Sequence, residues 1–473
     1  MVTSLPRENG LARERLLVVS ADGHATPPIH EIVSYLDYPA RRFVDELVRE
    51  NFTFVDLAAK PRRPSKETLE RFDTRHLVRS GGEYGAGNPQ IRLEQMDFEG
   101  IAGEIIHPHA QTNAPPFFVG QSLEVRAAGA RAYNRWLADF ITAGGGRLFG
   151  VAESGPLHDL DAAVTELTWA REHGFVAVSA PGSFPSPHLP YLYDEFFEPF
   201  WSACEDLGLV LSVHAGWAGT HDSVIDFTKM PPAERQKAMM AAAGNVVDDD
   251  PANQARLVTE AMGQKGSVMR RGLQQPRRVM WQLMAGGVLD RHPDLKIALT
   301  EIRADWVPAT LDHLAARFSE LHIACKSSPR EYWERQFLVS PSSIHRSEVA
   351  MREDIGLKQL AFGQDFPHWE GTWPHTLSWL QDALSELDED EIHAFVGLNA
   401  VAFYGLPGNQ LRIIADRIGP HVEEVLGGHI VSDELIEHLH HRSGYLRPVD
   451  PFYPDEIDVA LTSDLRGLVT RSR

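Results

Sequence analysis

The chain has 473 residues, of which 43% are hydrophobic, and a formal net charge of -21 at pH 7. This length allows a large core, as several domains of about 100 to 200 residues each or as one large barrel. The acidic balance argues against a partner such as nucleic acid or an anionic membrane surface, because phosphate groups require a basic face.

The cysteine content and the apolar runs indicate the cellular compartment in which the protein resides. Only Cys204 and Cys325 occur, so neither a disulfide framework nor a CxxC thiolate metal site is expected. Residues 1–15 lack an apolar core of signal-peptide length, and no stretch approaches the ~20 apolar residues of a membrane span. We therefore expect a cytoplasmic protein.

Apolar, β-branched runs of strand length alternate with segments of helical periodicity along the chain. Strands are predicted at residues 16–20, 103–107, 148–152, 175–179, 209–214, 295–300, 336–339 and 359–363, and helices at 125–141, 161–172 and 305–321. Eight strands that alternate with helices are typical of a parallel α/β barrel.

Two connections are much longer than a barrel needs, at residues 25–93 and 215–276. Long loops at the carboxyl ends of barrel strands usually cover the pocket and select the substrate. We therefore predict a distorted TIM (β/α)8 barrel over residues 16–406 with these two insertions. A helical C-terminal extension follows at residues 407–473, in which the segment 442–448 looks extended.

Metal-compatible side chains end three of the predicted strands. Asp22 and His24 follow the first, His214 ends the fifth and Asp365 follows the eighth. The carboxyl ends of parallel barrel strands meet at one face, so these side chains should converge there. Asp22 and His24 are two apart and should face the same side of a strand. A buried carboxylate such as Asp365 is costly unless it is paired or bound to metal. The sequence therefore predicts a divalent metal site.

Glu301 and Arg303 follow the sixth predicted strand, and Arg303 is a candidate contact of the substrate or of a second metal. Glu301 could ligate or bridge metal, shuttle a proton as a second catalytic group, or pair with Arg303. His107 and His109 end the second strand, where they could bind a second ion or a carbonyl oxygen of the substrate, or form ordinary hydrogen bonds within the loop.

Two further histidines lie close to the predicted metal ligands in the sequence. His221, just past the fifth strand, is a candidate of the same kind as His107. His368 follows Pro367, and we expect it to support Asp365 or to contact the substrate.

Ordered motifs along most of the chain resemble the amidohydrolase superfamily. They are Asp22-Gly23-His24-Ala25-Thr26-Pro27-Pro28, residues 92–101, residues 287–296, residues 301–308, Gln364-Asp365-Phe366-Pro367-His368 and residues 399–406. They look most like the amidohydrolase-related branch that holds aminocarboxymuconate semialdehyde decarboxylase and the γ-resorcylate decarboxylases. By position, the resemblance implies that Asp22, His24, His214 and Asp365 bind a catalytic divalent metal. It also implies that Asp365 takes a proton from metal-activated water.

The chain departs from these decarboxylases at the sixth strand, where relatives often carry a His followed by glycines and this chain has Thr300-Glu301-Ile302-Arg303. A carboxylate-rich ligand set suits Mn or Fe, and Zn remains an alternative, with one ion or two.

The first functional expectation is hydrolysis of an ester, thioester, lactone or amide, with Asp365 as base and then acid. The alternatives are non-oxidative decarboxylation of an aromatic or unsaturated acid, and a noncatalytic metal-binding barrel. The partner is then a small carboxylic acid or acyl derivative. A homodimer is expected by analogy with the relatives.

Overall fold

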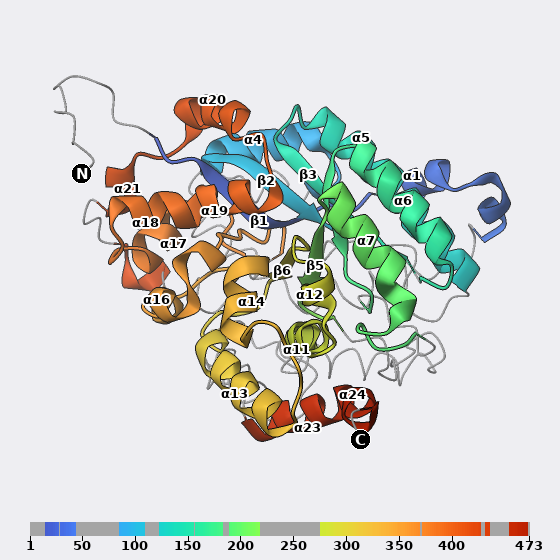
Figure 1. The fold of residues 1–473 in the computed structure, drawn as a ribbon. Helices are drawn as coiled ribbons and strands as arrows, with labels where there is room; N and C mark the ends of the chain where they lie inside the picture. Colours follow the sequence, from blue (N-terminus) through green and yellow to red (C-terminus); the bar gives the residue numbers. More distant parts are fainter. Residues whose placement is uncertain are drawn as a thin grey trace, which may run out of the picture.

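The computed structural model describes residues 15–27, 29–43, 85–108, 123–155, 157–182, 189–217, 275–368, 371–426, 431–435 and 454–471. Its centre is one parallel sheet in which seven strands follow one another in chain order. The strands are β1 (Val18–His24), β2 (Ile101–His107), β3 (Leu148–Ala152), β4 (Phe175–Ser179), β5 (Val210–His214), β6 (Ile297–Thr300) and β7 (Phe337–Ser340). Figure 1 shows these strands at the centre of the molecule with helices around them.

Residues 359–366 occupy the place of an eighth strand between β7 and β1, without regular strand pairing. On one side Leu360 forms an isolated parallel bridge with Val339. On the other, the Ala21 amide donates to the Phe362 carbonyl at 2.8 Å. The predicted distorted α/β barrel is therefore confirmed, with the eighth predicted strand present as an irregular segment that closes the ring.

The first strand begins later and ends later than the sequence predicts. The prediction covers residues 16–20, whereas β1 extends to His24 and pairs with β2 from Val18 to His24, with register shifts between Val18 and Val19 and between Ser20 and Gly23. Hydrogen bonding to β2 continues through the polar residues that a hydropathy pattern takes for a loop. Asp22 and His24 thus lie within the strand.

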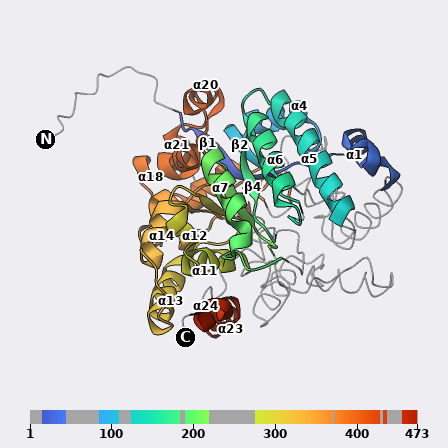
Figure 2. The same cartoon turned by 45° about the vertical axis from the view of Figure 1, so that its right-hand side comes forward.

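Helices surround the barrel. They are α1 (Ile29–Tyr35), α4 (Pro89–Glu99), α5 (Leu123–Ala143), α6 (Leu160–Glu172), α7 (Glu198–Leu207), α11 (Arg278–Ala285), α12 (Val288–Arg291), α13 (Val307–Glu320), α14 (Pro329–Gln336), α15 (Arg346–Val349), α16 (Arg352–Ile355), α17 (Thr376–Ala383), α18 (Glu389–His393), α19 (Asn399–Tyr404), α20 (Gly408–Ile418), α21 (Val422–Leu426), α23 (Pro454–Asp464) and α24 (Arg466–Arg471). Helices α5, α6 and α7 lie side by side (Figure 2). Among the described helices, none has the length and apolar character needed to span a membrane.

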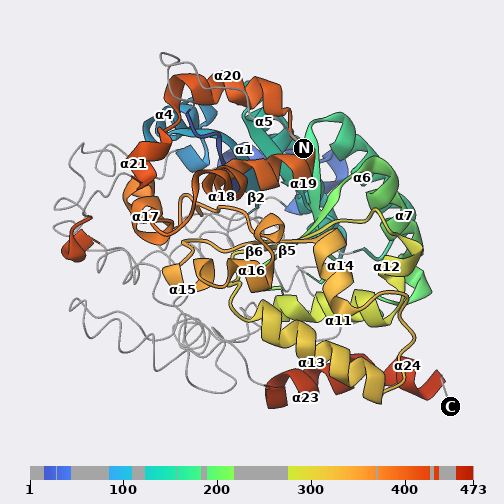
Figure 3. The ribbon, with the colours of Figure 1, turned by 60° about the vertical axis from the view of Figure 1, so that its left-hand side comes forward.

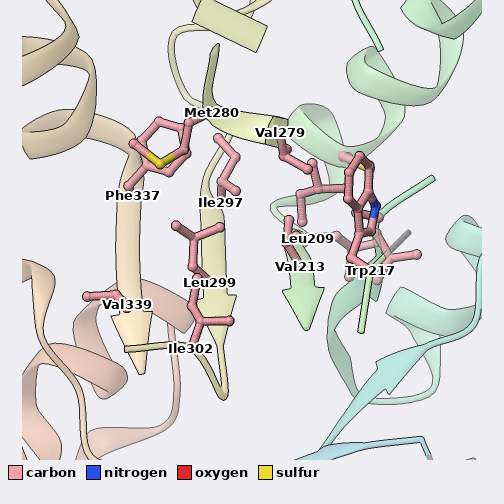
Figure 4. Packing of buried hydrophobic residues seen from close by; sticks show 14 of the residues in the cluster. Leu209, Val213, Trp217, Val279, Met280, Ile297, Leu299, Ile302, Phe337 and Val339 are labelled. Atoms are coloured by element: carbon pink, nitrogen blue, oxygen red, sulfur yellow. The ribbon is translucent and has the colours of Figure 1, made fainter. Parts of the chain in front are cut away.

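The apolar core lies in two layers. One layer fills the space between the strands and the surrounding helices, as where Met280 of α11 lies over Ile297 and Phe337 (Figure 4). The other fills the barrel interior, where Leu411 and Ala415 of α20 join residues from the beginnings of β1 and β2. Helix α20 therefore closes the barrel at the end opposite the carboxyl ends of the strands.

The last described helices, α23 and α24, dock on the barrel of the same chain, next to α11 and α13 (Figure 3). The buried Asp464 carboxylate accepts hydrogen bonds from Arg278 Nε at 3.0 Å and Trp281 Nε1 at 2.7 Å. Tyr193 donates its hydroxyl to the Asp464 carbonyl at 2.7 Å. The predicted extended segment at 442–448 lies outside the described residues, as do residues 44–84 and 218–274 of the two predicted insertions.

We predict that Asp464→Asn destabilises the protein by about 3 kcal/mol, because it leaves the buried Arg278 cation without its anion. Thermal unfolding and limited proteolysis of α23 measure the effect. Asp458→Asn is the matched control on the same helix: Asp458 is partly exposed and pairs with His313 and Arg317, and an exposed pair contributes at most about 1 kcal/mol. Equal melting temperatures for the two variants would contradict the prediction.

Candidate metal centre

Six side chains of ligand type meet at the carboxyl end of the barrel. They form two overlapping groups among the described residues, and within each group one ligand atom per residue lies within 4.8 Å of the others. The first group is Asp22, His24, His214 and Glu301; the second is His24, Glu301, Asp365 and His368. The structure thus brings together all five residues that the sequence marks as metal ligands, and adds His368.

The distances within the cluster are short for charged and imidazole groups. His24 Nε2 lies 3.4 Å from Asp22 Oδ1 and 3.1 Å from Asp365 Oδ1. His214 Nε2 lies 3.5 Å from Asp22 Oδ1 and 3.3 Å from Glu301 Oε2. These atoms therefore face a common centre.

Six atoms at this centre are buried and make no hydrogen bond to any described residue. They are Asp22 Oδ1, His24 Nε2, His214 Nε2, both carboxyl oxygens of Asp365 and His368 Nδ1. Each buried polar group left unsatisfied costs about 1 to 3 kcal/mol. Their concentration at one point fits a bound cation, and a set of imidazole and carboxylate ligands suits Zn, Mn or Fe.

Hydrogen bonds behind the cluster orient its members. His24 Nδ1 lies 2.9 Å from the Pro108 carbonyl oxygen, so this nitrogen is the donor and leaves Nε2 with its lone pair toward the centre. His214 Nδ1 lies 3.2 Å from the Ala215 carbonyl oxygen in the same way. The Ser342 hydroxyl donates to Asp22 Oδ2, which turns Oδ1 of the same carboxylate toward the cluster.

The backbone at Glu301 and Asp365 is strained. Their φ angles are 57° and 61°, in the left-handed region. A side chain with a Cβ adopts this region at a cost of about 1 to 3 kcal/mol, and such residues concentrate at functional sites. Glu301 directly follows β6, and Asp365 lies between the bridging residues Gly363 and Phe366. The left-handed backbone at each position directs its carboxylate into the barrel mouth.

The charges of the cluster act strongly on one another. For Asp22, burial favours the neutral form, but His214 and His24 outweigh it and hold the pKa well below the ordinary value. For Asp365, burial and then the negative charges of Glu301 and Asp22 raise the pKa well above the ordinary value. Burial lowers the pKa of His214, yet Glu301 and Asp22 raise it to about 9. The excess of carboxylates makes the centre attractive to a cation.

His107, which the sequence offers for a second ion or for substrate, has both ring nitrogens engaged. Its Nε2 lies 3.2 Å from the Ala21 carbonyl oxygen and its Nδ1 3.4 Å from Ser212 Oγ. Burial lowers its pKa to about 3, which keeps the ring neutral. Neither potential ligand group contains it. It therefore lies beside the cluster and supports β1. The other candidates of this kind, His109 and His221, lie outside the described residues.

Arg303 and His368 have partners that separate their roles. The Arg303 guanidinium forms a buried ion pair with Asp305, with Nε donating to Oδ1 at 3.1 Å. The nearest carboxylate to His368 is Asp365, with Nδ1 and Oδ1 2.8 Å apart. His368 also stacks on the His24 ring, with the ring centroids 4.0 Å apart. These contacts place His368 against Asp365 and Arg303 beside Asp305.

Other polar residues at the strand ends were missed by sequence reasoning. Ser342 follows β7, and its signal is the polar run from Ser340 to Ser343 after an apolar strand. Glu153 follows β3 directly, as an acid at the end of an apolar run, and Ser179 donates to its Oε1 at 3.1 Å. Burial raises the pKa of Glu153 to about 8. The rule that identified Asp365 would have identified Glu153.

The fold and the cluster define a class of protein: an α/β barrel with a candidate metal site at the carboxyl ends of its strands. The sequence matches the amidohydrolase family over residues 75–406, and the chain belongs to that family. This confirms the resemblance that the motifs predict. No curated protein matches the sequence significantly.

Three solved structures illustrate the shared barrel. An amidohydrolase from Mycobacterium avium subsp. paratuberculosis is 17% identical, with a TM-score of 0.52, and covers 84% of this chain and 100% of its own. The 5-carboxyvanillate decarboxylase from Sphingomonas paucimobilis is 16% identical, with a TM-score of 0.51, and covers 82% and 99%. A dihydroxybenzoic acid decarboxylase from Polaromonas sp., solved with bound manganese, is 17% identical, with a TM-score of 0.51, and covers 84% and 98%.

We predict that His214→Ala and Asp365→Asn each reduce bound divalent metal by about tenfold or more, because each removes a ligand from a set that converges on one centre. Elemental analysis of protein reconstituted with Mn and then freed of excess ion gives the stoichiometry. His107→Ala is the control, since the ring lies beside the cluster without entering it, and it should retain the metal. Metal loss in His107→Ala with retention in His214→Ala would refute the arrangement.

A second prediction concerns Glu153, whose pKa in the folded protein is about 8 and in the unfolded chain about 4.3. Between these values the folded protein holds a proton that the unfolded chain has released, so this group's contribution to stability falls as pH rises from about 4.5 to 8. Glu153→Gln should therefore lose less unfolding free energy than the wild type between about pH 5 and pH 8, as measured by denaturant titration. The exposed Glu172→Gln should follow the wild type. Parallel pH profiles for Glu153→Gln and wild type would rule this out.

Proposed function

We propose that the protein is a metal-dependent, non-oxidative decarboxylase of an aromatic or unsaturated carboxylic acid. The observation that carries this proposal is the position of Asp365. Its carboxyl group is buried at the centre of the cluster, with Oδ1 3.1 Å from His24 Nε2 and 2.8 Å from His368 Nδ1. The fold supports the proposal, because two of the similar barrels named above are decarboxylases of aromatic acids.

The residues that would hold the ion are Asp22, His24, His214 and Asp365, with Glu301 as a fifth ligand. One ion is favoured over two, because the two potential groups share His24 and Glu301. Manganese is the first candidate on account of the carboxylates and of the Polaromonas structure, with iron and zinc as alternatives. When bound, such an ion supplies positive charge that draws the substrate carboxylate and a neighbouring oxygen into the site.

The chain's own groups then handle the proton. Loss of CO2 breaks the bond between the carboxylate carbon and the ring or alkene carbon, and the electron pair stays on the latter. Asp365 donates a proton to that carbon, which forms the new C–H bond. His368, 2.8 Å from Asp365, can return a proton to the carboxylate for the next turnover.

Hydrolysis of an ester, thioester, lactone or amide is the second candidate. Glu301 favours it, because a carboxylate 3.3 Å from His214 gives the site a second base where decarboxylases often carry a His. A noncatalytic barrel has less support, since every predicted ligand position holds a ligand-type side chain. Under either reaction the partner is a small carboxylic acid or acyl derivative, and we infer a cytoplasmic homodimer.

The deciding experiment follows the fate of the carbon and the proton. Manganese-loaded protein is incubated in D2O with a panel of hydroxybenzoates, unsaturated acids, esters, thioesters and lactones. Decarboxylation should release one bicarbonate per substrate and leave one deuterium on the carbon that carried the carboxylate. Asp365→Asn should lower the rate by about 100-fold or more. Release of acid with alcohol, thiol or amine and without bicarbonate would establish hydrolysis instead.

A further inference from the structure

A buried ion pair lies between helix α4 and strands β1 and β2, close to the candidate metal centre. Arg92 of α4 donates through Nε to Glu104 Oε2 of β2 at 2.7 Å, and the two side chains are 1% and 0% exposed. Neither residue belongs to the potential ligand groups. The pair therefore needs an explanation apart from direct metal binding.

The remaining contacts of Arg92 connect β1 with the irregular eighth segment, the two elements that meet where the barrel closes. Its guanidinium donates to the His24 carbonyl of β1 at 3.4 Å and to the Phe366 carbonyl at 3.5 Å, and it lies 3.9 Å from the centroid of the Phe366 ring. One side chain thus holds the backbone of a candidate ligand on β1 and the backbone of the residue after Asp365.

The same place is where β1 and the eighth segment bond to each other. The His24 amide donates to the Phe366 carbonyl at 2.6 Å, and the Asp365 amide donates to the Asp22 carbonyl at 2.8 Å. The relative position of Asp22, His24 and Asp365 depends on this seam. The strained backbone of Asp365 makes the seam hard to hold without further contacts.

Gly23 shows how closely the pair approaches β1. A Cβ at this position would lie 2.2 Å from Glu104 Oε1 and 2.8 Å from Arg92 Nη2. Any side chain between the two β1 ligands would therefore displace the pair. The glycine of the Asp-Gly-His motif leaves room for the ion pair.

Stability alone does not account for such a pair. Burying two charges costs several kcal/mol per ion, and apolar residues of similar volume in place of a buried pair are often neutral or stabilising. The guanidinium group of an arginine, in contrast, carries several N–H donors in one rigid plane. It can bond a carboxylate and two backbone carbonyls at once, and so align separate segments of the backbone.

We propose that Arg92 and Glu104 are positioning residues, which align the β1 ligands with Asp365 and thereby set the affinity of the site for its metal. This inference rests on the proposed metal site. It assigns to the pair an effect on metal binding that a purely structural ion pair would not have.

Arg147 provides a matched control at the other end of the barrel. Its buried guanidinium also forms an ion pair, with the partly exposed Asp97 at 2.6 Å, and donates to two backbone carbonyls, Ile101 at 2.8 Å and Ala102 at 3.1 Å. These carbonyls lie at the start of β2, away from the ligand-bearing strand ends. Its loss should affect folding in the same way as loss of Arg92 without moving a ligand.

The test measures Mn²⁺ affinity of the full-length apo protein by competition with a fluorescent chelator, together with the melting temperature of each apo protein. Arg92→Met and the double variant Arg92→Met/Glu104→Leu should bind Mn²⁺ about tenfold more weakly or worse. Arg147→Met should keep the affinity within about twofold at a comparable loss of melting temperature. The double variant leaves no buried unpaired carboxylate, so it tests the proposal even if Arg92→Met does not fold.

Three results would overturn the proposal. Wild-type affinity in the double variant would show that the pair does not position the ligands. An equal loss of affinity in Arg147→Met would show that general destabilisation is the cause. If the wild type binds none of Mn²⁺, Fe²⁺ or Zn²⁺, the proposed metal site itself fails, and the positioning role fails with it. If the wild type binds metal and the Arg92 variant binds it equally well, only the positioning role fails.

Discussion

The site depends on the seam at which β1 meets the irregular eighth segment. Two backbone hydrogen bonds, from His24 to Phe366 and from Asp365 to Asp22, bring residues more than three hundred positions apart into one layer. Without that closure, Asp365 would have no fixed position relative to β1. The burial of carboxylates and imidazoles against one another follows from it, and so do their shifted proton affinities.

Much of this site can be predicted from the sequence because its residues lie at the carboxyl ends of the strands. Apolar runs identify parallel strands well because both faces of such a strand are buried, and seven of the eight predicted runs became regular strands close to their expected limits. The residues that follow those runs then fall at the barrel mouth. This places Asp22, His24, His214, Glu301 and Asp365 without any knowledge of side-chain packing.

The features of the site that the sequence does not predict depend on tertiary contacts. The left-handed backbone at Glu301 and Asp365 has no signature in residue type, because such residues rarely adopt it and do so only when their surroundings impose it. The contacts of Arg92 with carbonyls of β1 and the eighth segment, and of Ser342 with Asp22, depend on the closed ring. His107 shows the converse. Its place at the end of the second strand was predicted, but only the structure shows that the Ala21 carbonyl and the Ser212 hydroxyl are the hydrogen-bond partners of its two ring nitrogens.

The contact between Arg278 and Asp464 has a consequence for biosynthesis. The two residues are separated by 186 positions, so at about 5 to 20 residues per second Arg278 waits about 10 to 40 seconds for its anion during translation. The strands that precede α11 can associate early, but Arg278 of α11 lacks the Asp464 carboxylate throughout that interval. The contact between α11 and α23 can therefore form only after α23 has been synthesised. A nascent chain stalled before that point would leave the buried Arg278 and Trp281 side chains of α11 without their shared acceptor, the Asp464 carboxylate.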